Sequence, residues 1–229
     1  MLPHHFRALV LGSSGTIGSA LMRFLESHPH CEQVIGLNRH SVPAINFDAI
    51  DSIDSAYEAL KTGPRFHLIM NTIGALHSDH FMPEKKLADL NASQLNQQFI
   101  TNAIGPALCI KLFSQLIDPA GGIYANLSAK VGSIEDNRLG GWYSYRASKA
   151  ALNMLIKTAS IELRRTKPNV ILAAIHPGTV KSRLSRPFRG DELGREPDVA
   201  AQEIFHTLEQ LELKDSGCFK SYSGETIPW

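Results

Sequence analysis

Short apolar runs alternate along the whole chain with longer segments of helical periodicity. The apolar runs are largely continuous rather than alternating with polar residues, which is typical of strands in a parallel sheet that is buried on both faces. They span residues 6–11, 33–37, 44–47, 67–71, 122–127, 169–175 and 217–220. The helical segments span roughly 16–28, 51–62, 93–117, 144–166 and 198–211. This order predicts an α/β fold, a Rossmann-like doubly wound parallel sheet of about seven strands with helices on both faces.

Length and composition fit one domain of this class, spanning residues 1–229. Hydrophobic residues make up 43% of the chain, charged residues 20%, and the formal net charge is +1. This balance does not favour nucleic acid or an anionic membrane as a partner. Cys31, Cys109 and Cys218 lack metal-ligand spacing and indicate a reducing, cytoplasmic compartment. We expect no signal peptide and no membrane span, because no apolar run is long enough.

Three glycines lie where the first apolar run ends and the first helical segment begins. In such a strand–turn–helix unit, glycines allow a tight turn, close approach of the backbone to a pyrophosphate, and close packing of helix on strand. The helix then presents free N–H groups and the positive end of its dipole to the phosphates. We therefore predict a dinucleotide site rather than a plain turn. Its expected contacts are Gly12, Ser13, Ser14, Gly15, Thr16, Ile17 and Gly18.

The end of the second predicted strand indicates which dinucleotide binds. An acidic residue about twenty positions after the last glycine would bind the ribose 2′-hydroxyl of NAD, whereas a basic residue accommodates the 2′-phosphate of NADP. The acid is missing here, and Asn38 and Arg39 stand in its place. The sequence thus favours NADP(H) over NAD(H), with Ser13 and Ser14 as further donors. A solvated loop arginine is the alternative.

Candidate acid–base chemistry lies in the segment "GGWYSYRASKAALNML", residues 140–155. Tyr145 and Lys149 are four residues apart on a predicted helix, so their side chains share a face. A phenol with a pKa near 10 is a poor acid or base at neutral pH unless a nearby cation stabilises its anion. Lys149 is therefore expected to lower the pKa of Tyr145 and fit it for proton exchange with an alcohol oxygen.

With these residues in this order, the chain resembles the short-chain dehydrogenase/reductase family nearly from end to end. "YRASK" matches the Y-x-x-x-K motif at Tyr145 and Lys149, although the glycine spacing differs from the usual G-x-x-x-G-x-G. The resemblance implies hydride transfer between a nicotinamide cofactor and a carbonyl or alcohol carbon. Tyr145 would then move the proton, and Lys149 would also bind the nicotinamide ribose. "ITNAIGP" contains Asn102, which resembles the asparagine that bends a helix and holds a water in the proton relay.

Other matching segments imply further cofactor contacts. "INFDAID" carries an aspartate where the family keeps one near the adenine ring, "NTIG" resembles the N-N-A-G stretch, and "HPGTVKS" resembles the Pro-Gly motif near the nicotinamide. The residues concerned are Asp48, Asn71, Thr72, Ile73, Gly74, Pro177, Gly178, Val180 and Ser182. The resemblance also implies a mobile substrate lid around residues 183–197.

The catalytic serine of the family has no exact counterpart. Counting back from Gly132 puts Ala129 in its place and Ser128 one residue earlier. A shift of one residue on a strand turns the side chain to the other face, although a strand end can bulge. We assign the role to Ser128, with Ser133 as a second candidate and a structural serine as the alternative.

Two segments resemble a narrower, bacterial C-factor branch of the family: "LSAKVGSIEDNRLGGWYSYRASKAALNM" and the tail "SGCFKSYSGETIPW". Members of that branch are thought to act in cell–cell signalling or as carbonyl reductases. A cofactor-binding signalling protein with little turnover is therefore an alternative function. The glycine spacing also fits a sugar-nucleotide epimerase, but only about fifty residues follow the Pro-Gly turn.

Association into a homodimer or homotetramer is expected from the resemblance. Family members often associate through the tyrosine-bearing helix and the helix before it. Small residues at Ala147, Ala150 and Ala151 would let that helix pack closely against another element.

Two polar clusters carry weaker signals. His77 and His80, with Asp79 between them, form a poor metal-ligand pattern and are interpreted as solvated loop residues. The lid segment contains four arginines, which are interpreted as a solvated loop or, alternatively, as a site for an acidic substrate or a partner. They are Arg183, Arg186, Arg189 and Arg195.

Overall fold

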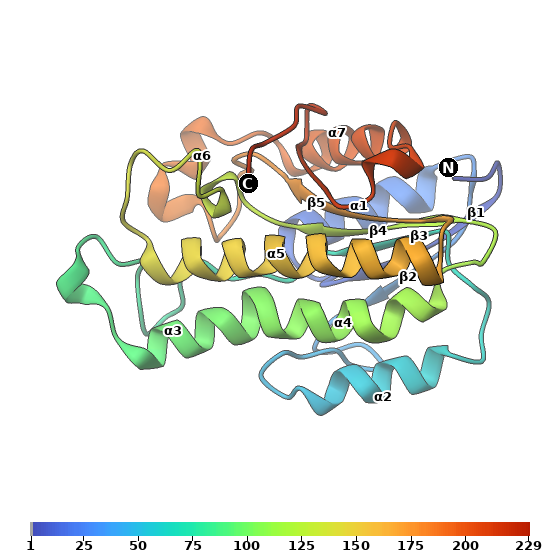
Figure 1. The fold of residues 1–229 in the computed structure, drawn as a ribbon, viewed down its shortest axis with the longest axis horizontal. Coiled ribbons are helices and arrows are strands. Elements are labelled where there is room, and N and C mark those ends of the chain that lie inside the picture. Colours follow the sequence, from blue (N-terminus) through green and yellow to red (C-terminus); the bar gives the residue numbers. More distant parts are fainter. Residues whose placement is uncertain (1) are drawn as a thin grey trace.

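The computed structural model describes residues 2–229 and contains six strands in one parallel sheet (Figure 1). The strand order is β2-β1-β3-β4-β5-β6, with every neighbouring pair parallel. The strands are β1 (Phe6–Leu11), β2 (Cys31–Leu37), β3 (Leu68–Asn71), β4 (Gly122–Leu127), β5 (Val170–His176) and β6 (Cys218–Ser221). The predicted α/β class with a parallel sheet is confirmed.

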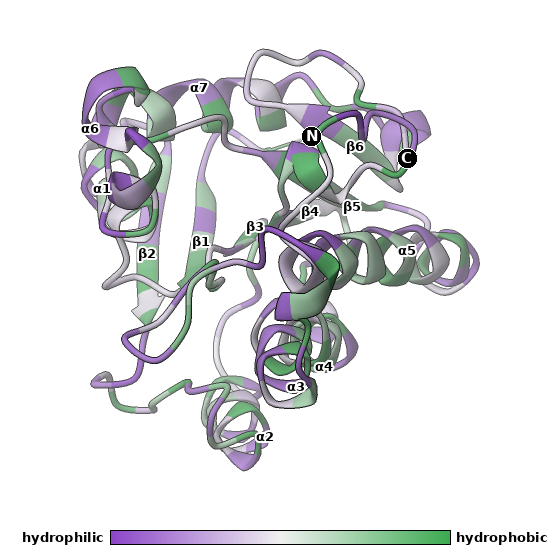
Figure 2. Cartoon of the chain, turned by 90° about the vertical axis from the view of Figure 1, so that its left-hand side faces the viewer, coloured by the Kyte–Doolittle hydropathy of each residue, from purple (hydrophilic) through white to green (hydrophobic). Residues whose placement is uncertain are grey.

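Helices cover both faces of the sheet. One face carries α1 (Thr16–Ser27) and α7 (Pro197–Glu209), and the other carries α2 (Asp51–Leu60), α4 (Gly105–Phe113) and α5 (Tyr143–Thr166) (Figure 2). Helix α3 (Ala92–Phe99) precedes α4 and continues into it through a π-helical turn, η2 (Ile100–Ile104). The shorter helical elements are η1 (Leu87–Asp89), η3 (Ser114–Leu116), η4 (Lys130–Gly132), η5 (Arg186–Phe188), α6 (Gly190–Leu193) and η6 (Leu213–Asp215).

The two faces of the sheet belong to two separate apolar clusters. In β1, Leu9 and Leu11 pack with α2, α4 and α5, whereas Ala8 and Val10 pack with α1 and α7. All four of these side chains are fully buried. Successive residues of a strand point to opposite faces, so a strand between two helical layers must be apolar at every position. This is why the apolar runs in the sequence are continuous.

The segment 44–47 is not a strand, so the sheet has six strands rather than about seven. Ile45 and Phe47 are buried in the cluster beneath α2 and α4, which accounts for the apolar pattern. However, the backbone N–H and the carbonyl oxygen of Asn46 both hydrogen-bond to the Ser52 side chain. Ser52 Oγ accepts from its N–H (2.8 Å) and donates to its carbonyl oxygen (2.9 Å). These two groups are therefore not available to a neighbouring strand.

One continuous helical stretch, Ala92–Leu116, is long and apolar enough to cross a membrane by length and composition. Polar residues such as Ser93, Asn96 and Gln97 interrupt the stretch, so it is not one continuous apolar run of the kind considered in the sequence. Half of the most apolar window is buried inside the fold, and the helix lies beside α5 (Figure 1). Core helices of globular proteins share this composition, so the stretch is weak support for a membrane span.

The carboxyl ends of the parallel strands meet at one edge of the sheet. In Figure 1 this edge lies on the left, where α5 begins, and Figure 2 views the molecule from that side. Open α/β sheets bind their ligands at this edge, because the loops that leave neighbouring strands come together there. Most of the predicted site residues lie in those loops.

Candidate active site

The glycine turn joins β1 to α1. Gly12 has φ +87°, a conformation that favours glycine, and its N–H donates to Leu37 O (2.7 Å). A Cβ on Gly18 would overlap the carbonyl oxygen of Gly12, so glycine is needed for the helix to approach the turn. Gly15 is the N-cap of α1 and offers no capping side chain. The first amides of α1 are therefore open to an anionic ligand, and this cradle fits a pyrophosphate.

The end of β2 lies against this turn. Asn38 Nδ2 donates to Ser13 Oγ (2.9 Å), and a Cβ on Gly36 would meet the Ser13 side chain. Ser14 and Arg39 are exposed. The structure thus brings together Ser13 and Asn38, two of the residues that the sequence suggested for a 2′-phosphate, and leaves Ser14 and Arg39 open to solvent.

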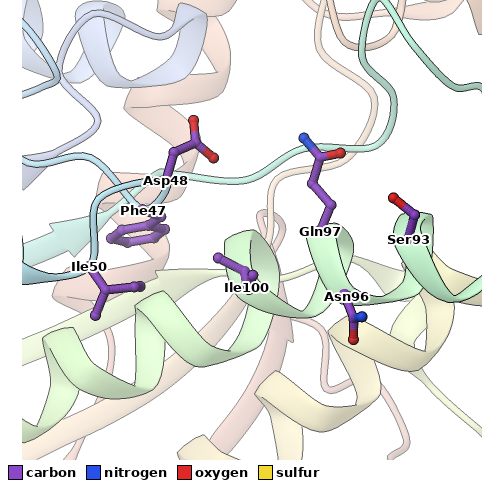
Figure 3. Close-up of a pocket in the computed structure, with 7 residues that line it drawn as sticks. All are labelled: Phe47, Asp48, Ile50, Ser93, Asn96, Gln97 and Ile100. Atoms are coloured by element: carbon purple, nitrogen blue, oxygen red, sulfur yellow. The ribbon is translucent and has the colours of Figure 1, made fainter.

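Asp48 lines a pocket of about 380 Å³ between the loop after β2 and helix α3. The other lining residues are Phe47, Ile50, Ser93, Asn96, Gln97 and Ile100. In Figure 3, the Asp48 carboxylate and the Gln97 amide extend to the same side, whereas Asn96 points away from them. The apolar residues Phe47, Ile50 and Ile100 form one wall. A flat ring with polar edges fits such a setting.

The segment after β3 connects the glycine turn to the catalytic helices. Thr72 Oγ1 donates to Leu11 O (2.9 Å), and Ile73 N–H donates to Asn71 Oδ1 (3.1 Å). Asn71 Nδ2 in turn donates to Asn126 Oδ1 on β4 (3.1 Å). Polar side chains therefore fix the course of the backbone where β3 ends.

Gly74 lies between two of the predicted catalytic side chains. A Cβ there would come within 3.3 Å of both Asn102 Oδ1 and Lys149 Nζ. Asn102 is fully buried, and it accepts from Ala75 N–H (3.0 Å) and donates to Ala75 O (2.8 Å). The asparagine side chain thus bonds both backbone groups of Ala75, as a neighbouring strand would, and fixes the loop after β3.

The π-helical turn at Asn102 has a cause in the sequence. In a regular α-helix, the carbonyl of Asn102 would accept from residue 106, which is a proline without an N–H. The proline ring would also clash with that carbonyl, and the wider π-turn relieves the clash. Asn102 therefore lies in a π-helical turn, and its carbonyl lacks its usual α-helical donor.

Tyr145 and Lys149 lie on the first two turns of α5 and are almost fully buried, at 9% and 3% exposure. Lys149 Nζ lies 5.9 Å from the centre of the Tyr145 ring and donates to Leu127 O (3.0 Å). Burial lowers the pKa of Lys149 to about 8 and raises the pKa of Tyr145 above its ordinary value. The pKa of Tyr145 is therefore raised rather than lowered as expected, and burial of the phenol is the cause.

Ser128 does not face Tyr145. Its hydroxyl donates to Asn153 Oδ1 (2.6 Å), further along α5, whereas Ala129 packs in one cluster with Tyr145. Ser133, the second candidate, donates to Trp229 O at the far end of the chain (3.3 Å). This geometry contradicts the assignment of a catalytic role to Ser128 and favours Ala129 as the residue at the serine position.

Apolar and aromatic side chains surround the Tyr145 ring. Leu76 and Ala129 are buried against it, and the rings of Trp142 and Phe188 lie 4.8 Å apart at their centres. Trp142 also lies edge-on to Tyr145, at 6.3 Å. Sequence reasoning missed this wall because its members come from three separate connections, those that follow β3, β4 and β5. The only local signal was "GGW" immediately before the catalytic motif.

Arg195 contacts the Pro-Gly turn that follows β5. Gly178 has φ +69°, and a Cβ there would come within 2.7 Å of Arg195 and Tyr222. The Arg195 guanidinium stacks 3.3 Å from the Tyr222 ring and donates to Pro177 O. Burial lowers the pKa of the neighbouring His176 to about 4, so this histidine is neutral at physiological pH.

The segment that follows is folded against the site rather than extended. Val180 is buried and pairs with Arg195 through a β-bridge, and Ser182 Oγ hydrogen-bonds Ser185 Oγ (3.1 Å). Phe188 of the same segment reaches the aromatic wall. Within residues 183–197, Phe188 therefore packs against the cluster that contains Tyr145.

Each of the four arginines in this region forms an ion pair with a carboxylate. The partners are Asp79 for Arg183, Asp191 for Arg186, Glu192 for Arg189 and Glu203 for Arg195. An acidic substrate would have to compete with these carboxylates, so the pairing argues against that alternative.

Across residues 2–229, no three His, Cys, Asp or Glu side chains are grouped to hold a metal ion. His77, one of the two histidines considered as metal ligands, instead contacts Leu184 O (3.2 Å).

Comparison with known proteins agrees with this arrangement. The family model described as short chain dehydrogenase matches residues 7–193. A 1-hydroxy-2-glutathionyl-2-methyl-3-butene dehydrogenase of Rhodococcus is 27% identical over 82% of this chain and 79% of its own length. The C-signal protein of Myxococcus xanthus is 31% identical over 62% of this chain and 83% of its own length.

Solved structures share the fold at low sequence identity. The NADPH-bound carbonyl reductase from chicken fatty liver has a TM-score of 0.84 and 23% identity over 99% of this chain and all of its own. The carbonyl reductase Sniffer of Drosophila melanogaster has a TM-score of 0.83 and 22% identity over the same shares. With the family match covering most of the chain, and with the Tyr145–Lys149 pair on α5, this protein belongs to the short-chain dehydrogenase family of NAD(P)-dependent oxidoreductases.

Proposed function

We propose that this protein is an NADP(H)-dependent reductase of small carbonyl compounds. The observation that carries the proposal is the convergence of Lys149 and Asn102 on Gly74, with Tyr145 beside Lys149 on α5, at the sheet edge that also holds the glycine turn. A nicotinamide ring fits beside Gly74, because a side chain at that position would crowd Asn102 and Lys149. The bound cofactor would supply the hydride, and the protein would supply binding and the proton.

Cofactor binding would use the whole carboxyl edge of the sheet. The open amides of α1 would bind the pyrophosphate, Arg39 the 2′-phosphate, and Asp48 the edge of the adenine ring. The turn at Pro177 and Gly178, with Val180 and Ser182 after it, would border the nicotinamide. NADPH-bound carbonyl reductases with the same fold support this choice of cofactor.

Tyr145 would donate its phenolic proton to the carbonyl oxygen of the substrate. The ammonium group of Lys149 would then stabilise the phenolate that forms, because it lies on the same face of α5. Asn102 would hold the loop after β3 in place, and its main-chain carbonyl, without its usual helical donor, would bind the water that returns the proton. With Ala129 in the serine position, the substrate oxygen would depend on Tyr145 for its hydrogen bond.

The substrate is proposed to be neutral and apolar. Leu76, Trp142 and Phe188 supply apolar and aromatic surface beside Tyr145, and the arginines of segment 183–197 are already paired with carboxylates. Aromatic aldehydes, ketones and quinones fit such a wall by ring stacking.

A reductase screen tests the proposal. Purified protein is mixed with NADPH or NADH and a panel of aldehydes, ketones and quinones, and cofactor oxidation is followed by absorbance. We expect oxidation of NADPH with at least one aromatic carbonyl compound and none with the Tyr145→Phe variant. NADPH binding without turnover on any member of the panel would contradict the proposal.

A C-factor-like signalling protein with little turnover is the second candidate. Two observations favour it: the 31% identity to C-signal and the alanine in the serine position. The intact Tyr145, Lys149 and Asn102 favour the enzyme, and the same screen separates the two.

The oligomeric state and the cellular compartment belong to the proposal. Met154, Leu155 and Ile161 leave an apolar stripe exposed on α5, at 66%, 38% and 49% exposure. A second copy of the chain would cover this stripe in a homodimer or homotetramer. A cytoplasmic location is proposed from the three cysteines, which are free thiols.

A further inference from the structure

A carboxylate outside the known motifs lies at the start of the catalytic helix. Glu84 comes from the loop that joins β3 to α3, and it is only 2% exposed. Its Oε2 accepts from the backbone N–H of Ser144 (3.2 Å), and its Oε1 accepts from the Ser144 hydroxyl. Ser144 is fully buried and directly precedes Tyr145. Glu84 therefore binds α5 one residue from the proposed proton donor.

Helix α5 has no cap of its own. Its N-cap residue is Trp142, whose indole has no acceptor and whose backbone is left-handed, at φ 53°. Gly140 and Gly141 before it are also left-handed. The backbone N–H of Trp142 donates to the carbonyl oxygen of Glu84 (2.5 Å). Main chain and side chain of Glu84 thus supply the acceptors that an N-cap residue normally supplies.

The buried charge of Glu84 depends on this contact. Within residues 2–229, Glu84 takes part in no ion pair. An unpaired buried carboxylate is costly, but the positive end of a long helix and two hydrogen-bond donors offset the cost. Glu84 is therefore stable where it lies only if α5 starts at this position.

The loop that carries Glu84 is itself held in place by α3. Gln98 Nε2 donates to Leu76 O (3.1 Å), and Gln94 Nε2 donates to Met82 O (3.1 Å). Leu76 packs against Tyr145. A chain of contacts thus runs from α3 through the loop to the first turn of α5.

From these contacts we infer that Glu84 is a positioning residue. It sets the start of α5 and thereby the location of the Tyr145 hydroxyl relative to the loop that borders the substrate. This role rests on the proposed reductase function for its catalytic consequence, whereas the ordering of the helix start does not depend on that function.

Three variants test the role: Glu84→Ala, Glu84→Gln and the control Ser216→Ala. Ser216 is also buried and accepts a backbone N–H, that of Leu172 (3.1 Å), but it lies at the opposite end of β5. The readouts are kcat and KM for the carbonyl substrate, NADPH affinity by fluorescence, and hydrogen exchange of the peptide spanning residues 140–149.

Glu84→Ala should lower kcat by about tenfold or more, because small displacements of a catalytic group are costly. NADPH affinity should stay unchanged, and exchange in residues 140–149 should rise. Glu84→Gln keeps an acceptor for the Ser144 N–H and should restore kcat to within about threefold of the unmodified protein. Ser216→Ala should lower thermal stability without changing kcat or exchange in that peptide.

Unchanged exchange in residues 140–149 of Glu84→Ala would overturn the inference, as would an equal loss of kcat in Ser216→Ala. If the unmodified protein reduces no carbonyl compound, the proposed function fails and the exchange data alone decide the role of Glu84. Should Glu84→Ala fail to fold, Ser144→Ala removes only the hydroxyl donor. It should then raise exchange and lower kcat in the same direction, and an unchanged kcat with unchanged exchange would refute the role.

Discussion

Replacing Lys149 by methionine should abolish catalysis and yet stabilise the folded protein at neutral pH. The ammonium group is 3% exposed, and the carbonyl oxygen of Leu127 is its hydrogen-bond acceptor, at 3.0 Å. Burial lowers the pKa of Lys149 from 10.5 to about 8. A shift of this size corresponds to a cost of about 3 kcal/mol of unfolding free energy while the group is charged. Methionine has a similar length and carries no charge.

The net gain is smaller than this cost, because the variant loses the hydrogen bond to Leu127 O. That loss is worth about 1–2 kcal/mol, so the variant should be more stable by about 1–2 kcal/mol at pH 7. For a chain of this size, the midpoint of thermal unfolding should rise by about 2–8 °C.

The stability gained by Lys149→Met should decrease as the pH rises. Below pH 8, Lys149 is charged in both the folded and the unfolded protein, so the full cost is present. Between pH 8 and 10.5 the folded protein loses the proton first and the cost disappears. The stability difference between Lys149→Met and the unmodified protein should therefore fall to zero or below by about pH 10. Calorimetry of both proteins from pH 6 to 10 measures it, and a variant that is less stable at pH 7, or a difference independent of pH, would refute the reasoning.

Five further substitutions have expected outcomes. Tyr145→Phe should lower kcat by about a hundredfold or more while the Kd for NADPH stays nearly unchanged, and undiminished turnover would remove Tyr145 from the mechanism. Arg39→Ala should weaken binding of NADPH and leave NADH binding unaffected, whereas equal binding of both by the unmodified protein would contradict the role of Arg39. Ala129→Ser should raise kcat, while Ser128→Ala should lower thermal stability without a specific effect on kcat. Met154→Glu should shift the protein toward monomer in light scattering, and an unchanged mass would place the interface elsewhere.

The parts of the fold that were predictable from the sequence depend on local patterns. A parallel strand between two helical layers must be apolar at every position, so β1, β4 and β5 appear in the sequence as continuous runs. The glycine turn was also predictable, because the left-handed backbone of Gly12 and the helix contact at Gly18 each require glycine. Tyr145 and Lys149 were predictable because helical spacing alone puts them on one face.

The parts that were not predictable depend on contacts between distant segments. The run 44–47 has the composition of a strand, but Ser52 takes up the backbone groups of Asn46. The ion pair of Arg183 with Asp79 joins residues more than a hundred positions apart, and the sequence around either residue gives no signal of it. The raised pKa of Tyr145 likewise depends on burial of the phenol by the surrounding segments.

A difference of one residue decides whether Ser128 or Ala129 lies beside Tyr145. In β4, Tyr124 faces the cluster of α4 and α5, Ala125 faces that of α1 and α7, and Leu127 faces the latter again. The backbone of Ser128 still follows the strand, because its N–H donates to Ile175 O (2.8 Å), so its side chain turns back beneath α5 and meets Asn153. Ala129 lies beyond the last residue of β4, so strand alternation no longer fixes its direction, and it packs in one cluster with Tyr145. The one-residue shift in the sequence therefore leaves a methyl group, and no hydroxyl, at this place beside Tyr145.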